Sequence, residues 1–209
     1  MGRPKDADSA RTYEQIIQAA LDVLHQAGDP QSMSLRVVAA QAGVSSSTIQ
    51  YYFATKEDLL EACLDGYYER LGELGQALIQ AAAESTDPTA YVEASVRELF
   101  RFAVAERALI ALRLSINTTR RELHPRRQPE FMGSMVRAAA AALAPHVEID
   151  EHDARMAIHA MSVIVVRFAL FSESELSALG ADLNTLDPRW VEDHVARIAI
   201  RLVKPRGKL

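Results

Sequence analysis

The stretch SLRVVAAQAGVSSSTIQYYF, residues 34–53, constrains the fold more than any other part of the chain. Val38 and Ala39 are apolar at helical spacing, and they follow Ser34, a residue type that often caps helices. Gly43 then permits a sharp turn before a second, shorter helix. A helix, a tight turn with glycine and a short helix, in that order, are typical of a helix-turn-helix motif.

The second helix of this motif is expected to expose polar side chains that carry no charge. Ser45 is its predicted cap, and Ile49 is predicted to pack inward. The residues that then point outward are Ser46, Ser47, Gln50 and Tyr51. Side chains of this kind donate and accept hydrogen bonds, which suits base edges in the major groove of DNA.

Neighbouring residues supply candidates for contacts to the DNA backbone. We expect Thr48 and Tyr52 to hydrogen-bond phosphate oxygens, and Lys56 to add a positive charge at the next helix start. Arg36, on the first helix of the motif, is a further candidate for a phosphate contact. The alternative reading of the same residues is a corner between two helices with a solvated polar face.

The rest of the chain has the periodicity of helices and no signal for strands. The predicted helices lie at 9–28, 56–84, 87–118 (two helices), 128–146, 150–171 and 187–203. Asp187 is the expected cap of the last helix, with Pro188 as its first residue, and the chain ends up to Asp8 and beyond residue 203 are expected to be loose. We therefore predict an all-α protein with a first domain over residues 1–55, a long linking helix at about 56–84, and a second helical domain within 56–209.

Composition and the length of the apolar runs argue against disulfides, a cysteine metal site, a signal peptide and a membrane span. A single cysteine, Cys63, excludes an internal disulfide and a cysteine-cluster metal site. No signal peptide is expected because the first apolar run begins only at Ile16, and the longest uncharged apolar stretch, residues 156–166, is too short to cross a bilayer. Residues 1–56 hold five basic and five acidic residues within a chain of net charge -5, so any attraction to DNA must come from the local placement of charge.

One acidic segment resembles a metal site in composition only. Residues 148–155, EIDEHDAR, group carboxylates with His152, but His159 lies seven residues further on, too far to share one ion without other ligands. We interpret the segment as a solvated, acid-capped helix start. No metal and no cofactor are expected.

From about Tyr13 to Leu60 the chain resembles the DNA-binding domain of the TetR family of bacterial transcriptional regulators. The segments that carry the resemblance are SLRVVAAQAGVS, the pair SS, TIQYYF and KEDLL. The chain departs from the family pattern at Ser46, where many relatives have Lys or Arg, at Ser47, where Gly or Pro is common, and at Gln50, where Tyr is common. The missing cation is expected to weaken nonspecific attraction to DNA, while Gln50 offers a bidentate partner for adenine.

The resemblance implies a C-terminal domain that binds a small-molecule effector and forms a homodimer through its last two helices. Candidate effector contacts are Phe100, Arg113, Asn117, Met135, Arg167 and Phe168. Candidate interface residues are Ile158, Met161, Val165, Trp190, Val191, Val195, Ile198 and Leu202. The alternatives are that the aromatic and Met residues are ordinary core, and that each Arg pairs with a carboxylate such as Glu98 or Glu106 or extends to solvent.

These observations together predict a cytoplasmic, nucleoid-associated homodimer that is a transcriptional repressor. It would occupy a near-palindromic double-stranded operator until an effector releases it. An activator or a ligand-independent regulator on the same scaffold is an alternative. A helical enzyme is the rival from another class, but no nucleophile–base spacing or phosphate-binding loop in the sequence supports it.

Overall fold

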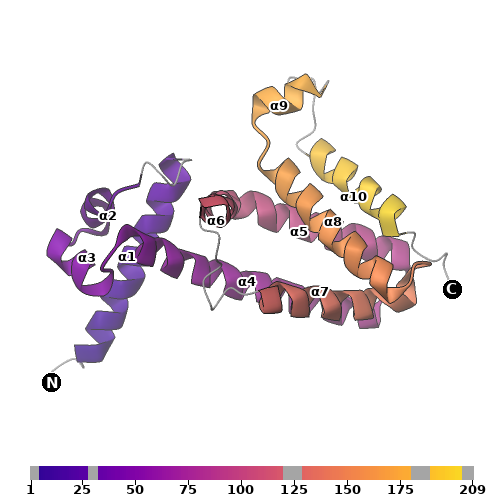
Figure 1. Ribbon diagram of the computed structural model, residues 1–209, viewed down its shortest axis with the longest axis horizontal. Helices are drawn as coiled ribbons and strands as arrows, with labels where there is room; N and C mark the ends of the chain where they lie inside the picture. The colour runs from indigo at the N-terminus through magenta and orange to yellow at the C-terminus, as the bar shows by residue number, and fades with distance from the viewer. Residues whose placement is uncertain (1–4, 28–32, 120–128, 180–188, 204–209) are drawn as a thin grey trace. The chain divides into compact units, whose positions relative to one another are not determined.

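The regular elements of the structure are helices (Figure 1). The structure is a computed structural model that describes residues 5–27, 33–119, 129–179 and 189–203. Its elements are α1 (Lys5–Ala27), α2 (Leu35–Ala42), α3 (Ser46–Tyr52), α4 (Lys56–Glu84), α5 (Pro88–Ala105), α6 (Arg107–Thr119), α7 (Pro129–Leu143), the 3-10 turn η3 (Ala144–His146), α8 (Glu151–Ala169), α9 (Glu173–Ala178) and α10 (Trp190–Val203). Within these ranges there is no strand, so the predicted all-α class is confirmed.

The helices form two compact units that are not continuous in sequence. The first unit comprises Met1–Arg70 with Ala108–Arg121, and the second comprises Leu71–Arg107 with Glu122–Leu209. The long helix α4 therefore contributes its first half to one unit and its second half to the other. The predicted boundary after residue 55 does not coincide with the division between these two units, and it stays a prediction.

The first unit has an apolar core to which α1, α2, α3, α4 and α6 all contribute. Its large, fully enclosed side chains are Ile16, Leu24, Met33, Val38, Ile49, Leu59, Leu64, Leu109, Ile110 and Leu112. Burial of each such side chain contributes about 1.5–3 kcal/mol to folding. A short helix such as α3 is marginal in isolation, so this core is what holds it in place.

The second unit is built around α5, α8 and α10, which pack against one another, with α7 packed against α8 (Figure 1). Its core residues include Val92, Val96, Phe100, Ala157, Met161, Val165, Val195 and Ala199. Glu192 of α10 is buried, and its carboxylate accepts hydrogen bonds from Arg101 at 2.8 Å and Arg97 at 3.3 Å on α5. A buried charge needs such partners, so these contacts fix the pairing of α5 with α10.

The structure corrects two expectations about element boundaries. Helix α1 begins at Lys5, so the prediction of a loose segment up to Asp8 is wrong for residues 5–8. These residues lack apolar periodicity, which is why the pattern marked a helix only from Ser9. Helix α9 was not predicted because it has only six residues, although Ser172 and Glu175 form a capping box at its start. The expected cap and first residue of the last helix, Asp187 and Pro188, lie outside the described residues.

Candidate nucleic-acid interface

The turn between α2 and α3 is set by capping residues and one glycine. The Ser34 hydroxyl accepts a hydrogen bond from the backbone N–H of Val37 at 3.3 Å, as expected for the cap of α2. Gly43 ends that helix with φ +66°, in the left-handed region that favours glycine, and its N–H donates to the Ala40 carbonyl at 3.3 Å. The predicted helix-turn-helix is therefore present in the first unit.

Helix α3 is anchored on one side and exposed on the other. Ser45 caps it by accepting the N–H of Thr48 at 3.1 Å, and the Ile49 side chain is 0% exposed in the core. The opposite face exposes the side chains of Ser46, Ser47, Gln50 and Tyr51, as the sequence predicted. Tyr51 is 82% exposed, and no described residue hydrogen-bonds the Gln50 amide. Helix α3 thus presents uncharged donors and acceptors on its exposed face, and the Gln50 amide among them is bound by no residue in the described part of the chain.

The Ser45 hydroxyl at the start of α3 hydrogen-bonds two other hydroxyls. The Ser45 hydroxyl lies 2.8 Å from the Ser47 hydroxyl and 2.8 Å from the Thr48 hydroxyl. Ser45 has one hydroxyl proton, and one of its lone pairs already accepts the Thr48 N–H. It can therefore donate to only one of the two neighbouring hydroxyls and must accept from the other. One proton of the Ser47 and Thr48 pair remains available to an external acceptor such as a phosphate oxygen.

Tyr52, the second residue expected to bind phosphate, is engaged within the protein. Its half-buried hydroxyl donates to the Ser9 carbonyl at 3.2 Å and lies 3.0 Å from the Ser9 hydroxyl on α1. Its ring meets the rings of Tyr51 at 5.1 Å and Tyr13 at 6.2 Å, both edge-on. Sequence reasoning missed Ser9 and Tyr13, because contacts between residues some forty positions apart leave no local pattern.

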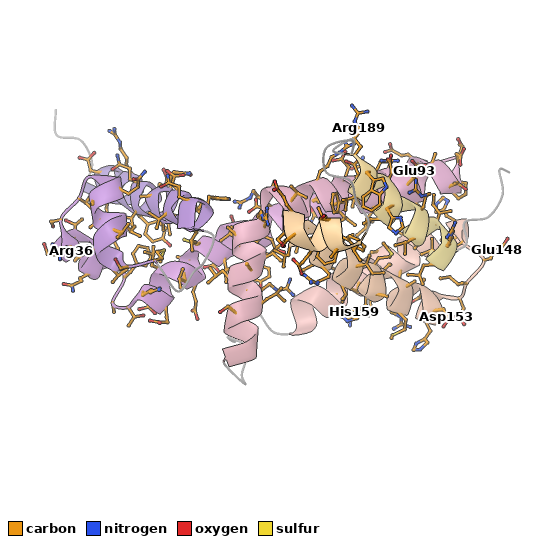
Figure 2. The ribbon with its side chains drawn as sticks, turned by 90° about the horizontal axis from the view of Figure 1, so that it is seen from above. Arg36, Glu93, Glu148, Asp153, His159 and Arg189 are labelled. Atoms are coloured by element: carbon orange, nitrogen blue, oxygen red, sulfur yellow. The ribbon has the colours of Figure 1, made fainter. Side chains whose placement is uncertain are left out.

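Arg36 and Lys56 are the basic candidates for phosphate contacts beside α3, and this role stays a prediction. Arg36 lies on the exposed surface of α2 (Figure 2). At the start of α4, the Thr55 hydroxyl accepts the N–H of Asp58 at 3.1 Å, and the Asp58 carboxylate accepts the N–H of Thr55 at 2.9 Å. This reciprocal capping fixes the helix start that carries Lys56, whose side chain is half-buried.

The effector candidates are divided between the two units. Arg113, in the first unit, lies over the Tyr68 ring at 5.9 Å from its centroid, and the Asn117 side chain lies outside the described residues. In the second unit, Phe100 is buried in the core, and Met135 packs so closely on Gly75 that a Cβ there would lie 2.7 Å from its Cε. Phe168 contacts the rings of Phe171 and His194 at centroid distances of 4.9 and 6.1 Å. Their role as effector contacts stays a prediction.

Arg167 extends to solvent, which was one of the alternatives for it. Its guanidinium pairs with Glu175 of α9 and lies over the Phe171 ring at 4.3 Å from the centroid. Backbone and side-chain hydrogen bonds from Ser172, together with Arg167, lower the pKa of Glu175 to about 2. The suggested carboxylate partner Glu98 instead binds Arg101 at 2.8 Å.

The interface candidates fall into two groups. Met161, Val165 and Val195 fill the core of their own chain, so their side chains offer no surface to a partner. They lie on the inner faces of α8 and α10, which helical periodicity alone does not distinguish from the outer faces. The residues that remain partly or largely exposed are Ile158, Trp190, Val191, Ile198 and Leu202.

Two strongly exposed apolar residues of α8 were not among the interface candidates. Met156 is 58% exposed and Val163 is 57% exposed. They are seven residues apart and so lie on one face of the helix. The sequence did carry a signal for them, because residues 156–166 of this helix are an uncharged, mostly apolar stretch. The chain itself covers only some sides of that stretch.

The acidic segment before α8 is a helix cap, as interpreted. The Asp150 carboxylate accepts the N–H of Asp153 at 2.8 Å. Among the residues that the structure describes, no group of three or more His, Cys, Asp or Glu side chains is placed to hold a metal ion. In the same residues, no helix combines the length and the apolarity needed to cross a membrane.

Comparisons with known proteins agree with this geometry. Residues 16–63 match the model of the bacterial regulatory proteins of the tetR family. The HTH-type transcriptional regulator BetI of Proteus mirabilis is 38% identical over 69 residues, which are 33% of this chain and 34% of that protein. The match thus spans about a third of the length of this curated relative, and its 69 residues are about the size of one small domain.

Solved structures resemble the chain over nearly its whole length. A protein described as a TetR-family transcriptional regulator from Mesorhizobium loti has a TM-score of 0.65 at 18% identity, covering 94% of this chain and 96% of that one. The transcriptional regulator FadR from Bacillus subtilis, in complex with stearoyl-CoA, has a TM-score of 0.56 at 16% identity, covering 90% and 97%. These matched proteins are named as transcriptional regulators. Residues 16–63, which hold the helix-turn-helix, thus match the model of the tetR family, and the chain as a whole shares its fold with these solved regulators.

Proposed function

We propose that this chain is a homodimeric, sequence-specific transcriptional repressor that leaves a near-palindromic DNA operator when a small-molecule effector binds. The observation that carries the proposal is the capped, core-anchored helix α3, whose outer face presents Ser46, Ser47, Gln50 and Tyr51. A rigid helix of this kind fits the major groove, where each base pair displays its own pattern of donors and acceptors. The protein acts in the cytoplasm, at the nucleoid.

Charge placement predicts how this repressor holds DNA. Helix α3 carries no Lys or Arg, and residues 1–56 have equal numbers of acidic and basic residues. Arg36 lies within the motif and Lys56 follows it, and the other basic residues of this range are Arg3, Lys5 and Arg11. For duplex DNA, each phosphate that the protein neutralises makes the slope of log K against log salt concentration steeper by roughly 0.9. We therefore expect a shallow salt dependence, with affinity that comes mainly from hydrogen bonds and from the fit of the dimer.

A second copy of the chain is the proposed cover for the exposed apolar faces of α8 and α10. These helices are neighbours in the second unit, and Met156, Val163 and Leu202 expose apolar side chains on them. A two-fold axis would bring the same two helices from each copy into a four-helix bundle. The dimer would then place its two α3 helices in major grooves about one helical turn, roughly 34 Å, apart.

The effector part of the proposal is supported by a structural neighbour. FadR, which shares the fold, holds stearoyl-CoA in its structure. A ligand releases DNA only by binding more tightly to the state in which the two α3 helices do not match the groove spacing. An activator, or a regulator without a ligand, remains the alternative on this scaffold.

A mobility-shift experiment with DNA from upstream of the gene tests the proposal. Wild-type protein should retard one fragment specifically, and the Ser46→Ala/Gln50→Ala double variant should lose that retardation. A Gln76→Ala variant, which alters an exposed glutamine on α4, serves as the control and should bind as wild type does. Failure of the wild type to retard any fragment of the locus would favour the enzyme alternative. Light scattering and mass spectrometry of co-purified small molecules test the dimer and the effector.

A further inference from the structure

We infer that Ser9 of α1, acting through the hydroxyl of Tyr52, positions the DNA-reading helix α3. The inference rests on the proposed function, because it assigns Ser9 a role in reading DNA. The Ser9–Tyr52 pair joins residues 43 positions apart, by the two hydrogen bonds of 3.0 and 3.2 Å. Ser9 lies outside the helix-turn-helix and outside the residues 16–63 that match the family model.

The hydrogen bonds of this pair leave Tyr52 without a proton for DNA. Tyrosine has a single hydroxyl proton, and Tyr52 directs it to the Ser9 carbonyl. The Ser9 hydroxyl is then the donor to the Tyr52 oxygen. A phosphate oxygen can only accept, so Tyr52 cannot bind phosphate while the pair is intact. The expectation that Tyr52 contacts the DNA backbone is thereby replaced by an internal role.

Edge-on aromatic contacts connect this pair to the exposed face of α3. The Tyr52 ring packs edge-on against Tyr13 of α1 on one side and against Tyr51 on the other. Tyr51 is 82% exposed and is one of the proposed base readers. A shift of the Tyr52 ring therefore moves the surface that Tyr51 presents to DNA.

The C-terminal end of α3 needs such a contact. The helix has seven residues, and its N-terminal end is already fixed by the Ser45 cap, with Ile49 anchoring its middle. After Tyr52 the chain leaves the helix at Phe53, whose buried side chain packs against Tyr13 at 5.3 Å between ring centroids. The Ser9–Tyr52 pair and this ring contact thus tie the second end of α3 to α1.

A double-mutant cycle separates this role from a direct phosphate contact. The variants are Ser9→Ala, Tyr52→Phe and the double variant, measured for affinity to the fragment that wild-type protein retards. Loss of one hydrogen bond is worth about two- to tenfold. Ser9→Ala keeps the backbone carbonyl that accepts the Tyr52 proton, whereas Tyr52→Phe removes both hydrogen bonds, so the double variant should lose no more than Tyr52→Phe alone. Ser9→Thr, which keeps the hydroxyl, should restore the wild-type affinity.

Hydrogen exchange of the DNA-free protein gives a second readout. Amides of residues 46–52 should exchange faster in Ser9→Ala and in Tyr52→Phe than in the wild type. The control is Thr12→Val, because the Thr12 hydroxyl donates only within α1, to the Asp8 carbonyl at 2.8 Å. That variant should leave the exchange of α3 unchanged.

Two results would overturn the inference. One is unchanged exchange of residues 46–52 in Ser9→Ala. The other is a loss of affinity in Tyr52→Phe that adds in full to the effect of Ser9→Ala, since it would place the Tyr52 hydroxyl on a phosphate and not on Ser9. If wild-type protein retards no DNA at all, the proposed function fails, and the exchange measurement alone decides whether Ser9 holds α3.

Discussion

The substitution Gln50→Ala removes the amide that we expect to read adenine. The Gln50 side chain is exposed, and no described residue binds it, so its removal leaves the protein's own hydrogen bonds intact. A bidentate amide–adenine pair is worth about 1–3 kcal/mol of discrimination. A dimer places two such pairs on a palindrome, so the loss should be about 2–6 kcal/mol, or about thirtyfold to 10⁴-fold in specific affinity.

Fluorescence anisotropy at one fixed salt concentration measures this loss. Binding to the specific operator and to a scrambled duplex should be compared for the wild type, Gln50→Ala and the control Gln76→Ala. The specific affinity of Gln50→Ala should fall toward the scrambled value, while the control stays within about twofold of the wild type. Equal specific affinities of Gln50→Ala and wild type would refute the assignment of Gln50 as a base reader.

Three further predictions concern the turn, the dimer and the buried thiol. Gly43→Ala should lower the free energy of unfolding by about 1–2 kcal/mol in denaturant melts, because φ +66° strains any Cβ although no atom lies within 4 Å of it; unchanged stability would contradict this. Val163→Glu should yield a monomer by light scattering with unchanged helicity by circular dichroism, and a persistent dimer would exclude this face as the interface. Burial raises the pKa of Cys63 from 9.0 to about 12, so stability should fall as pH rises from about 9 toward 12, by at most about 1.4 kcal/mol per pH unit. Urea melts at pH 8 and pH 10 should show that Cys63→Ala reduces this loss, and an equal loss in both proteins would contradict it.

The local features of the first unit could be predicted from sequence because each has a local chemical signal. Ser34 and Ser45 cap helices where their hydroxyls suggested, and Gly43 adopts the positive φ that its place after an apolar helix indicated. The exposed face of α3 followed from helical periodicity once Ile49 was taken as its buried anchor.

The features that escaped prediction depend on contacts between distant segments. The Ser9–Tyr52 pair and the binding of Glu192 by Arg97 and Arg101 join residues between 43 and 95 positions apart, for which a single sequence has no signal. Charged hydrogen bonds to Glu93 and Asp193 also raise the pKa of Arg97, which no composition rule would indicate. Periodicity predicted helices at 150–171 and 187–203 but did not say which of their apolar residues face their own chain.

Selection from random double-stranded DNA with the full-length chain tests the central claim most directly. If α3 reads base edges as part of a dimer, selected sequences should contain two inverted half-sites about 10 base pairs apart from centre to centre. The same selection with Gln50→Ala should lose the preference at the base pair that this residue reads, while the spacing of the half-sites stays the same. Selected pools without a shared inverted repeat, or identical preferences for both proteins, would contradict the claim that this helix recognises an operator.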